Sequence, residues 1–166
     1  EAASLRFKKH AHQTIAHTLI FDLEDGCRKK ELSRELLKLE LSGLRKSRPD
    51  VQIAIRINPF RTVEFEKDIT LLKTVSDYVD VVMLAKAGEA YGSAEVRDLS
   101  SILLDLNSKI TIQPIIEHPR SLKIVPDLMS YSTVKHVVFG IHDFSKAMGI
   151  NITPTNWIEE LSYFLN

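Results

Sequence analysis

The sequence contains a single cysteine, Cys27, so no disulfide can form within these 166 residues. It also lacks an excess of charge of either sign, because 22 Lys and Arg residues balance 22 Asp and Glu residues. A basic excess is typical of proteins that bind nucleic acids or anionic membranes, so neither partner is expected. The lone cysteine favours a reducing, cytoplasmic location.

Long hydrophobic runs are missing as well. The longest uninterrupted apolar run covers five residues, 81–85, whereas a transmembrane helix needs about 20. The first residues, EAASLRFKKHAHQT, lack the apolar centre of a secretory signal. We therefore expect neither a membrane-spanning helix nor a signal peptide.

The glycine-rich fingerprint of a dinucleotide site is also absent. The sequence instead contains short, apolar, β-branched runs that alternate with helical patterns. The runs cover residues 17–22, 51–58, 80–86, 110–117 and 134–140. The helical patterns cover residues 28–46, 62–75 and 94–106, a segment after Pro119 that contains Pro126, and residues 153–166. Nearly apolar strands separated by helices indicate a parallel sheet covered by helices.

No linker or low-complexity tract interrupts this alternation, so residues 1–166 are predicted to form one α/β domain. Two architectures are compatible with it, a doubly wound open sheet and a (β/α)₈ barrel. The missing glycine fingerprint removes one reason to choose the open sheet. Length argues the other way, because a complete barrel typically needs about 250 residues. Periodicity alone leaves the two architectures open.

Single side chains carry further expectations. Met83 and Met148 are expected in the core, and His118 is expected to cap the helix that follows it. The charged run RKKELSRE, residues 28–35, is interpreted as a solvated helix face with paired signs.

Polar residues follow each predicted strand at its C-terminal end. They are Asp22 and Glu24, Arg56 and Asn58, Lys86, Glu117, and Asp143 just past the fifth strand. In parallel α/β folds this edge of the sheet is where ligands bind. The pattern therefore predicts a compact polar site built from the ends of all five strands.

The residue types suggest the chemistry of that site. Two carboxylates, Glu117 and Asp143, with positions left for water or substrate oxygens, suit Mg²⁺. Arg56 offers a planar fork for a substrate carboxylate, and Lys86 could neutralise a developing oxyanion. The alternative is that Lys86 and Arg56 only form structural ion pairs with Asp22 and Glu117 at the strand ends. The pattern alone does not decide between these interpretations.

Five segments, FDLEDG, IRIN, MLAKA, IIEHP and FGIHDFSKAMGI, occur in this order between residues 17 and 150. In order and spacing they resemble the citrate lyase β-subunit-like branch of the HpcH/HpaI aldolase family. The resemblance implies a (β/α)₈ TIM barrel and a carbon–carbon lyase that depends on Mg²⁺ or Mn²⁺. It implies as substrates 3-hydroxy acids or their thioesters, such as citryl or malyl groups on coenzyme A, giving a 2-oxo acid. Trimers or hexamers are expected by the same resemblance.

The resemblance also implies roles for single residues. Glu117 and Asp143 would be the metal ligands, and Arg56 would hold the carboxylate or oxo group of the substrate. Asp22 and Glu24 would lie beside the metal, where either could hold a water that acts as the base. Lys86, at a strand end, is assigned to the catalytic residues. Asn58 and His142 are assigned to substrate binding. His142 departs from the citrate lyase branch, which leaves the substrate open.

The chain is shorter than the family barrel, with about five to six of the eight strand–helix units. We therefore expect an incomplete barrel: a fragment, part of a longer chain, or a partial barrel completed by another subunit. Two alternatives to the lyase remain at this point. One is a catalytically silent relative that acts as a structural or regulatory partner, and the other is a pyruvate-type metal-dependent aldolase that uses no thioester.

Overall fold

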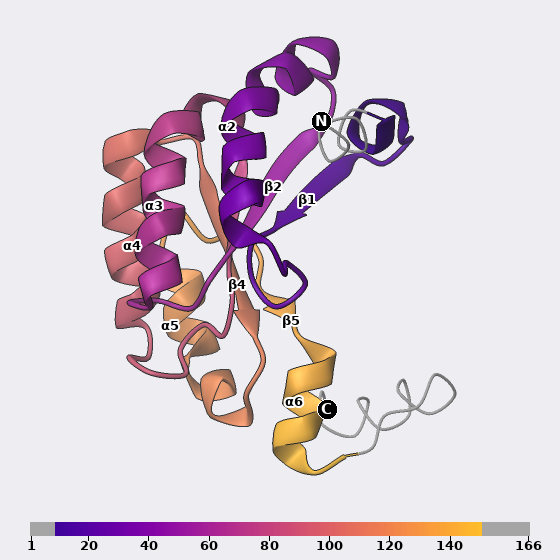
Figure 1. The fold of residues 1–166 in the computed structure, drawn as a ribbon. Coiled ribbons are helices and arrows are strands. Elements are labelled where there is room, and N and C mark those ends of the chain that lie inside the picture. Colours follow the sequence, from indigo (N-terminus) through magenta and orange to yellow (C-terminus); the bar gives the residue numbers. More distant parts are fainter. Residues whose placement is uncertain (1–8, 151–166) are drawn as a thin grey trace.

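The computed structural model describes residues 9–150, in which strands and helices alternate along the chain (Figure 1). A helical segment at 9–13 comes first. The elements that follow are β1 (Thr18–Asp22), α2 (Lys30–Ser47), β2 (Gln52–Ile57), α3 (Val63–Val75), the 3-10 helix η1 (Ser76–Tyr78), β3 (Val81–Leu84), α4 (Ala94–Leu106), β4 (Thr111–Ile116), the 3-10 helix η2 (Pro119–Ile124), α5 (Val125–Ser130), β5 (Val138–Phe139) and α6 (Ile141–Met148). The helix predicted over 153–166 lies outside the described residues.

The five strands form one parallel sheet in the order β1-β2-β3-β4-β5. The sheet is curled, with helices α2, α3 and α4 on its outer face (Figure 1). This is the incomplete TIM-barrel type of α/β fold that the sequence predicted, and the described residues form about half of a barrel. Because the strands are parallel and in sequential order, all five C-terminal ends meet at one edge.

Alternation along the strands divides their side chains between two faces. Ile53, Ile55 and Ile57 of β2 point outward and belong to the main core beneath the helices. Ala54 of β2 and Met83 of β3 belong to a second, smaller cluster on the inner face. The same alternation separates Leu23 from its neighbours Asp22 and Glu24. Leu23 is fully buried in the main core, whereas Asp22 and Glu24 line a cavity on the inner face.

The predicted helix after Pro119 is split in two. His118 begins it as expected, because its Nδ1 accepts a hydrogen bond of 3.1 Å from the Arg120 N–H. The 3-10 helix η2 then runs to Ile124, and Pro126 lies in the first turn of α5. A proline lacks the N–H that a helix interior needs, whereas the first turn tolerates it. The sequence predicted one helical segment containing Pro126, whereas the structure begins a new helix, α5, at Val125.

Two further predictions were wrong. The fifth strand, expected over residues 134–140, is only Val138–Phe139, because Val134 makes a single bridge to Ile112 and the exposed residues 135–136 leave the ladder. Helix α6 follows directly, and Met148 on it is 38% exposed rather than part of the core. Met83 is buried as expected.

In the described part of the chain, no helix is long and apolar enough to cross a membrane.

Candidate active site at the carboxyl ends of the strands

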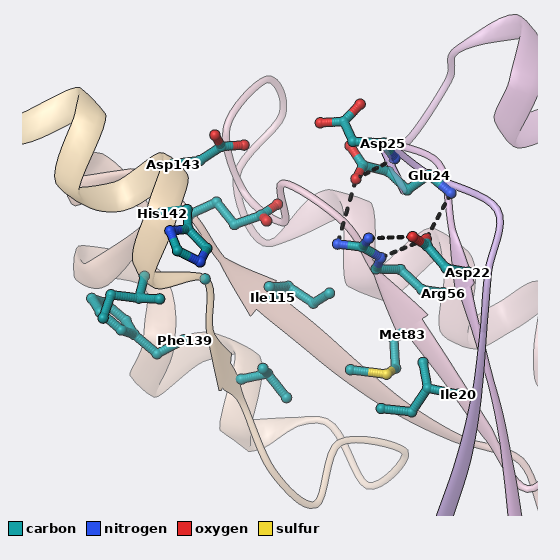
Figure 2. A pocket seen from close by; sticks show the side chains of 14 residues that line it. Ile20, Asp22, Glu24, Asp25, Arg56, Met83, Ile115, Phe139, His142 and Asp143 are labelled. Atoms are coloured by element: carbon teal, nitrogen blue, oxygen red, sulfur yellow. Dashed lines mark hydrogen bonds and ion pairs between the residues drawn. The ribbon is translucent and has the colours of Figure 1, made fainter. Parts of the chain in front are cut away.

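A cavity of about 480 Å³ opens at the C-terminal ends of the strands, on the inner face of the sheet (Figure 2). Its apolar wall includes Ile20, Met83 and Ile115 (Figure 2). The polar residues that line it are Asp22, Glu24, Asp25, Arg56, Glu117, His142 and Asp143. The sheet therefore brings together, in one cavity, most of the residues that the sequence assigned to a site.

Arg56 forms a two-bond ion pair with Asp22, because β1 and β2 place these residues side by side in register. Arg56 Nε lies 2.7 Å from Asp22 Oδ1, and Arg56 Nη2 lies 2.5 Å from Asp22 Oδ2. Gly26 is needed for this arrangement, since a Cβ at that position would lie 2.2 Å from Asp22 Oδ2. The remaining terminal nitrogen of Arg56, Nη1, lies 3.5 Å from Glu24 Oε2.

We expect the Asp22 carboxyl to titrate below its ordinary pKa of 3.8. Burial raises this pKa, but hydrogen bonds from Arg56 and from the backbone N–H groups of Glu24 and Gly26 outweigh burial. A lowered pKa in the folded state means that the ion pair stabilises the fold above pH 3.8, and that this stabilisation is lost as pH falls through the folded pKa. Carboxyl ¹³C NMR measures the midpoint, which Arg56→Gln should raise. A wild-type midpoint above 3.8 would contradict the pairing.

Lys86 connects the acids of the β1 loop to the centre of the site. Its Nζ donates to Glu24 Oε1 at 2.7 Å and to Asp25 Oδ2 at 3.0 Å. Burial lowers the pKa of Lys86, but the two carboxylates outweigh this and raise it above its ordinary value. The ammonium therefore stays charged across the physiological pH range, which suits a fixed cation and not a base. The backbone φ of Lys86 is +52°, in the left-handed region.

The same residue also fixes Glu117 through its backbone. Lys86 N–H donates to Glu117 Oε2 at 2.8 Å. On the opposite side, a Cβ at Gly140 would lie 2.3 Å from Glu117 Cγ, so only glycine leaves room for this side chain. Burial is the main cause that raises the pKa of Glu117, and the charges of Glu24 and Asp143 raise it further. Asp143 lies in the first turn of α6, across the cavity from Asp22 and Arg56 (Figure 2).

The carboxylates of Glu117 and Asp143 fit a divalent cation that prefers oxygen ligands. A buried carboxyl whose pKa is raised by neighbouring negative charges would be held in its ionised form by such a cation. No group of three or more His, Cys, Asp or Glu side chains within residues 9–150 is arranged to hold a metal. Mg²⁺ is compatible with two carboxylates, because it usually keeps several waters.

Among the predicted site residues, Asn58 alone neither lines the cavity nor contacts an acid that lines it. It is 4% exposed, and its Nδ2 donates to Leu23 O and to Asp68 Oδ2. Arg56 pairs with Asp22, as the ion-pair alternative proposed. The Lys86 side chain pairs with Glu24 and Asp25 instead of Glu117. The catalytic roles of Arg56 and Lys86, and substrate binding by Asn58 and His142, stay predictions.

Sequence reasoning missed Arg34 and Asp68, which lie behind the site. Arg34 was interpreted as part of a solvated face, but it is 3% exposed, and Asp68 is fully buried. A signal was present in the sequence. Asp68 is three residues after Phe65 and directly before Ile69, which places it on the apolar stripe of α3.

A curled parallel α/β sheet with a polar cavity at its carboxyl ends defines a protein of the TIM-barrel class. The family model described as HpcH/HpaI aldolase/citrate lyase matches residues 3–159, so the chain belongs to this family. No curated protein sequence matches the chain significantly.

Similar solved structures include RipC from Yersinia pestis, with 22% identity, a TM-score of 0.68, and coverage of 89% of this chain and 63% of that one. A citrate lyase β subunit from M. tuberculosis, complexed with oxaloacetate and magnesium, has 22% identity, a TM-score of 0.65, and coverage of 90% and 58%. The CitE protein from Mycobacterium tuberculosis, with magnesium, acetoacetate and coenzyme A, has 21% identity, a TM-score of 0.67, and coverage of 98% and 56%. At these identities the likeness shows the fold. The chain spans less than two thirds of each of these structures.

Proposed function

We propose that the protein is a carbon–carbon lyase or aldolase that depends on Mg²⁺ or Mn²⁺ and acts on a 3-hydroxy acid or its coenzyme A thioester. One observation carries the proposal: a single cavity holds the carboxylates of Glu117 and Asp143 opposite the Arg56 guanidinium. Family membership over residues 3–159 supports the same class of reaction. Relatives with magnesium, oxaloacetate or coenzyme A support the choice of cation and substrate class.

Glu117 and Asp143 would hold the cation, which when bound supplies a Lewis acid that stabilises negative charge developing on substrate oxygens. Lys86 N–H keeps one carboxylate oxygen of Glu117 in place, and Gly140 allows the close approach. The ligands are therefore oriented before substrate arrives, which is the usual condition for electrostatic stabilisation of a transition state.

Arg56 would bind the carboxylate of the 2-oxo acid portion. Two of its nitrogens are occupied by Asp22, and Nη1 faces the cavity beside Glu24. Asp22 thus fixes the plane of the guanidinium and leaves one edge for the substrate. A water held by Glu24 or Asp22 would take the proton of the 3-hydroxyl, since both carboxylates lie on this side of the cavity.

The apolar wall would hold the carbon skeleton of the substrate. Ile20, Met83 and Ile115 form this part of the cavity (Figure 2). Its volume of about 480 Å³ lies within the range of ordinary small-molecule sites. His142 is exposed at the opposite rim, where it could contact the distal end of a longer substrate such as a thioester.

Divalent cation binding tests this proposal directly. We expect calorimetric titration with MgCl₂ to show one site, and Glu117→Gln or Asp143→Asn to weaken it by at least about 10-fold. Glu66→Gln, on the exposed side of α3, is the matched control and should leave affinity unchanged. Unchanged affinity in both site variants would overturn the assignment. Release of a 2-oxo acid from malyl-coenzyme A, but not from free malate, would assign the thioester; the reverse would favour a free-acid aldolase.

A further inference from the structure

A buried polar network lies behind the candidate site and does not line its cavity. It consists of Arg34 on α2, Asp68 on α3 and Asn58 directly after β2, which are 3%, 0% and 4% exposed. Buried charged groups are costly unless they are paired and hydrogen-bonded. A network of this kind therefore needs a reason beyond the packing of apolar helices against a sheet.

The contacts run in one direction, from the helix layer toward the end of β1. Arg34 Nε donates to Asp68 Oδ1 at 2.8 Å, and Arg34 Nη2 lies 2.7 Å from the same oxygen. The other oxygen of Asp68 accepts from Asn58 N–H at 2.8 Å and from Asn58 Nδ2 at 2.7 Å. Asp68 thus holds Asn58 at two points, its backbone N–H and its side-chain amide. The side-chain oxygen, Asn58 Oδ1, accepts from Lys30 Nζ of α2 at 2.5 Å.

The network ends on the backbone between two residues of the site. Asn58 Nδ2 also donates to Leu23 O at 2.8 Å. Leu23 separates Asp22 from Glu24, and its own N–H donates to Arg56 O at 2.9 Å. Both backbone polar groups of Leu23 are therefore hydrogen-bonded. Its N–H is bound by Arg56 of β2, and its carbonyl is bound by the side-chain amide of Asn58.

We propose that Asn58, oriented by Asp68 and Arg34, is a positioning residue that fixes the backbone at Leu23 and thereby holds Asp22 and Glu24 at the cavity. This inference rests on the proposed function, because it assigns those two acids to the site. It gives Asn58 a role that differs from the substrate binding expected from the sequence. It also explains why Arg34 and Asp68 are charged at buried positions, since the charge pair keeps the Asn58 amide in one orientation.

The physical basis is the cost of leaving Leu23 O without a partner. A buried carbonyl that loses its donor keeps the full penalty of having left water, so the segment would move to find another partner. Displacement of catalytic groups by about 1 Å can lower a rate about 100-fold. Glu117 directly follows β4 and Asp143 lies in the first turn of α6, so a shift of the backbone at Leu23 should leave cation binding unchanged.

The test compares Asn58→Ala with Glu64→Gln in the whole chain. Asn58→Ala removes the bond to Leu23 O. Glu64→Gln weakens the Arg34–Glu64 pair, 2.7 Å, which joins the same two helices without touching Leu23. We expect the midpoint of Asp22, measured by carboxyl ¹³C NMR, to rise only in Asn58→Ala, while the Kd for Mg²⁺ stays within about 2-fold in both. In malyl-coenzyme A cleavage, kcat should fall about 10- to 100-fold in Asn58→Ala, with little change in KM.

A purely structural role would lower the Tm of Asn58→Ala but leave the Asp22 midpoint and kcat unchanged, and this result would overturn the inference. Should Asn58→Ala not fold, Asn58→Ser serves instead, because its hydroxyl is too short to bridge Asp68 and Leu23 O. If the wild-type chain binds no Mg²⁺ and cleaves no thioester, the proposed function fails. Even then, the Asp22 midpoint in Asn58→Ala shows whether Asn58 positions the backbone at Leu23.

Discussion

Replacing Lys86 with Met is expected to lower the free energy of unfolding by about 2 kcal/mol and to abolish turnover. The reason is Glu24, which is 2% exposed and accepts a hydrogen bond of 2.7 Å from Lys86 Nζ. Removing one partner of a buried ion pair leaves the other charge uncompensated. Arg56 Nη1, 3.5 Å from Glu24, offsets part of this loss, so we expect less than the full effect of a completely buried pair.

Lys67→Met is the matched control for this experiment. Lys67 also contacts two carboxylates, those of Glu31 and Glu64, but it is 43% exposed and the pairs lie at the surface. Pairs at the surface contribute little to stability, so chemical denaturation should separate the two variants clearly. Equal stability of Lys86→Met and the wild type would show that Glu24 does not depend on this ammonium.

A second substitution at the same position separates the side chain from the backbone. Lys86→Gly also removes the ammonium, but glycine adopts the left-handed φ of +52° without the steric cost of a Cβ. We therefore expect Lys86→Gly to be more stable than Lys86→Met by about 1 kcal/mol. Both variants keep the N–H that donates to Glu117, so Mg²⁺ affinity should change less than turnover.

Much of the fold could be predicted because the strands carry their own signal. The runs over 17–22 and 51–58 are apolar and β-branched, and the structure has strands at Thr18–Asp22 and Gln52–Ile57. The fifth strand was predicted too long because the predicted run begins at Val134, where the structure has only a bridge to Ile112. Hydrophobicity reports that a segment is buried, but the length of its hydrogen-bonded ladder depends on its neighbour in the sheet.

The candidate site was predictable as a set of residues but not as a set of contacts. The rule that parallel strands present their C-terminal ends together places Asp22, Arg56 and Glu117 at one edge. Which acid pairs with Arg56 depends on the register Asp22↔Arg56, and register is a property of the assembled sheet. The pairing of Asp68 with Arg34 was missed for the same reason, since the two residues are 34 positions apart on different helices.

Replacing Gly140 with Ala is expected to weaken Mg²⁺ binding by at least about 10-fold, although the new side chain is only a methyl group. Its Cβ would lie 2.3 Å from Glu117 Cγ and 2.9 Å from Glu117 Oε1. The backbone cannot easily retreat, because Gly140 N–H donates to Ile116 O at 2.8 Å. Glu117 must therefore move and give up the hydrogen bond from Lys86 N–H. The φ of Gly140 is −87°, so alanine meets no backbone strain and the effect is confined to this contact.

Gly43→Ala on α2 is the control, because nothing lies within 4 Å of the position that its Cβ would take. It should leave Mg²⁺ affinity unchanged and stabilise the helix by up to about 1 kcal/mol. A double-mutant cycle with Glu117→Ala then isolates the cause. Gly140→Ala should cost about 1–3 kcal/mol in the wild-type background, as overpacking does, and almost nothing once the Glu117 side chain is gone. An equal cost in both backgrounds would show that the new methyl group clashes with a group other than Glu117. Unchanged Mg²⁺ affinity in Gly140→Ala would show that Glu117 is not a metal ligand.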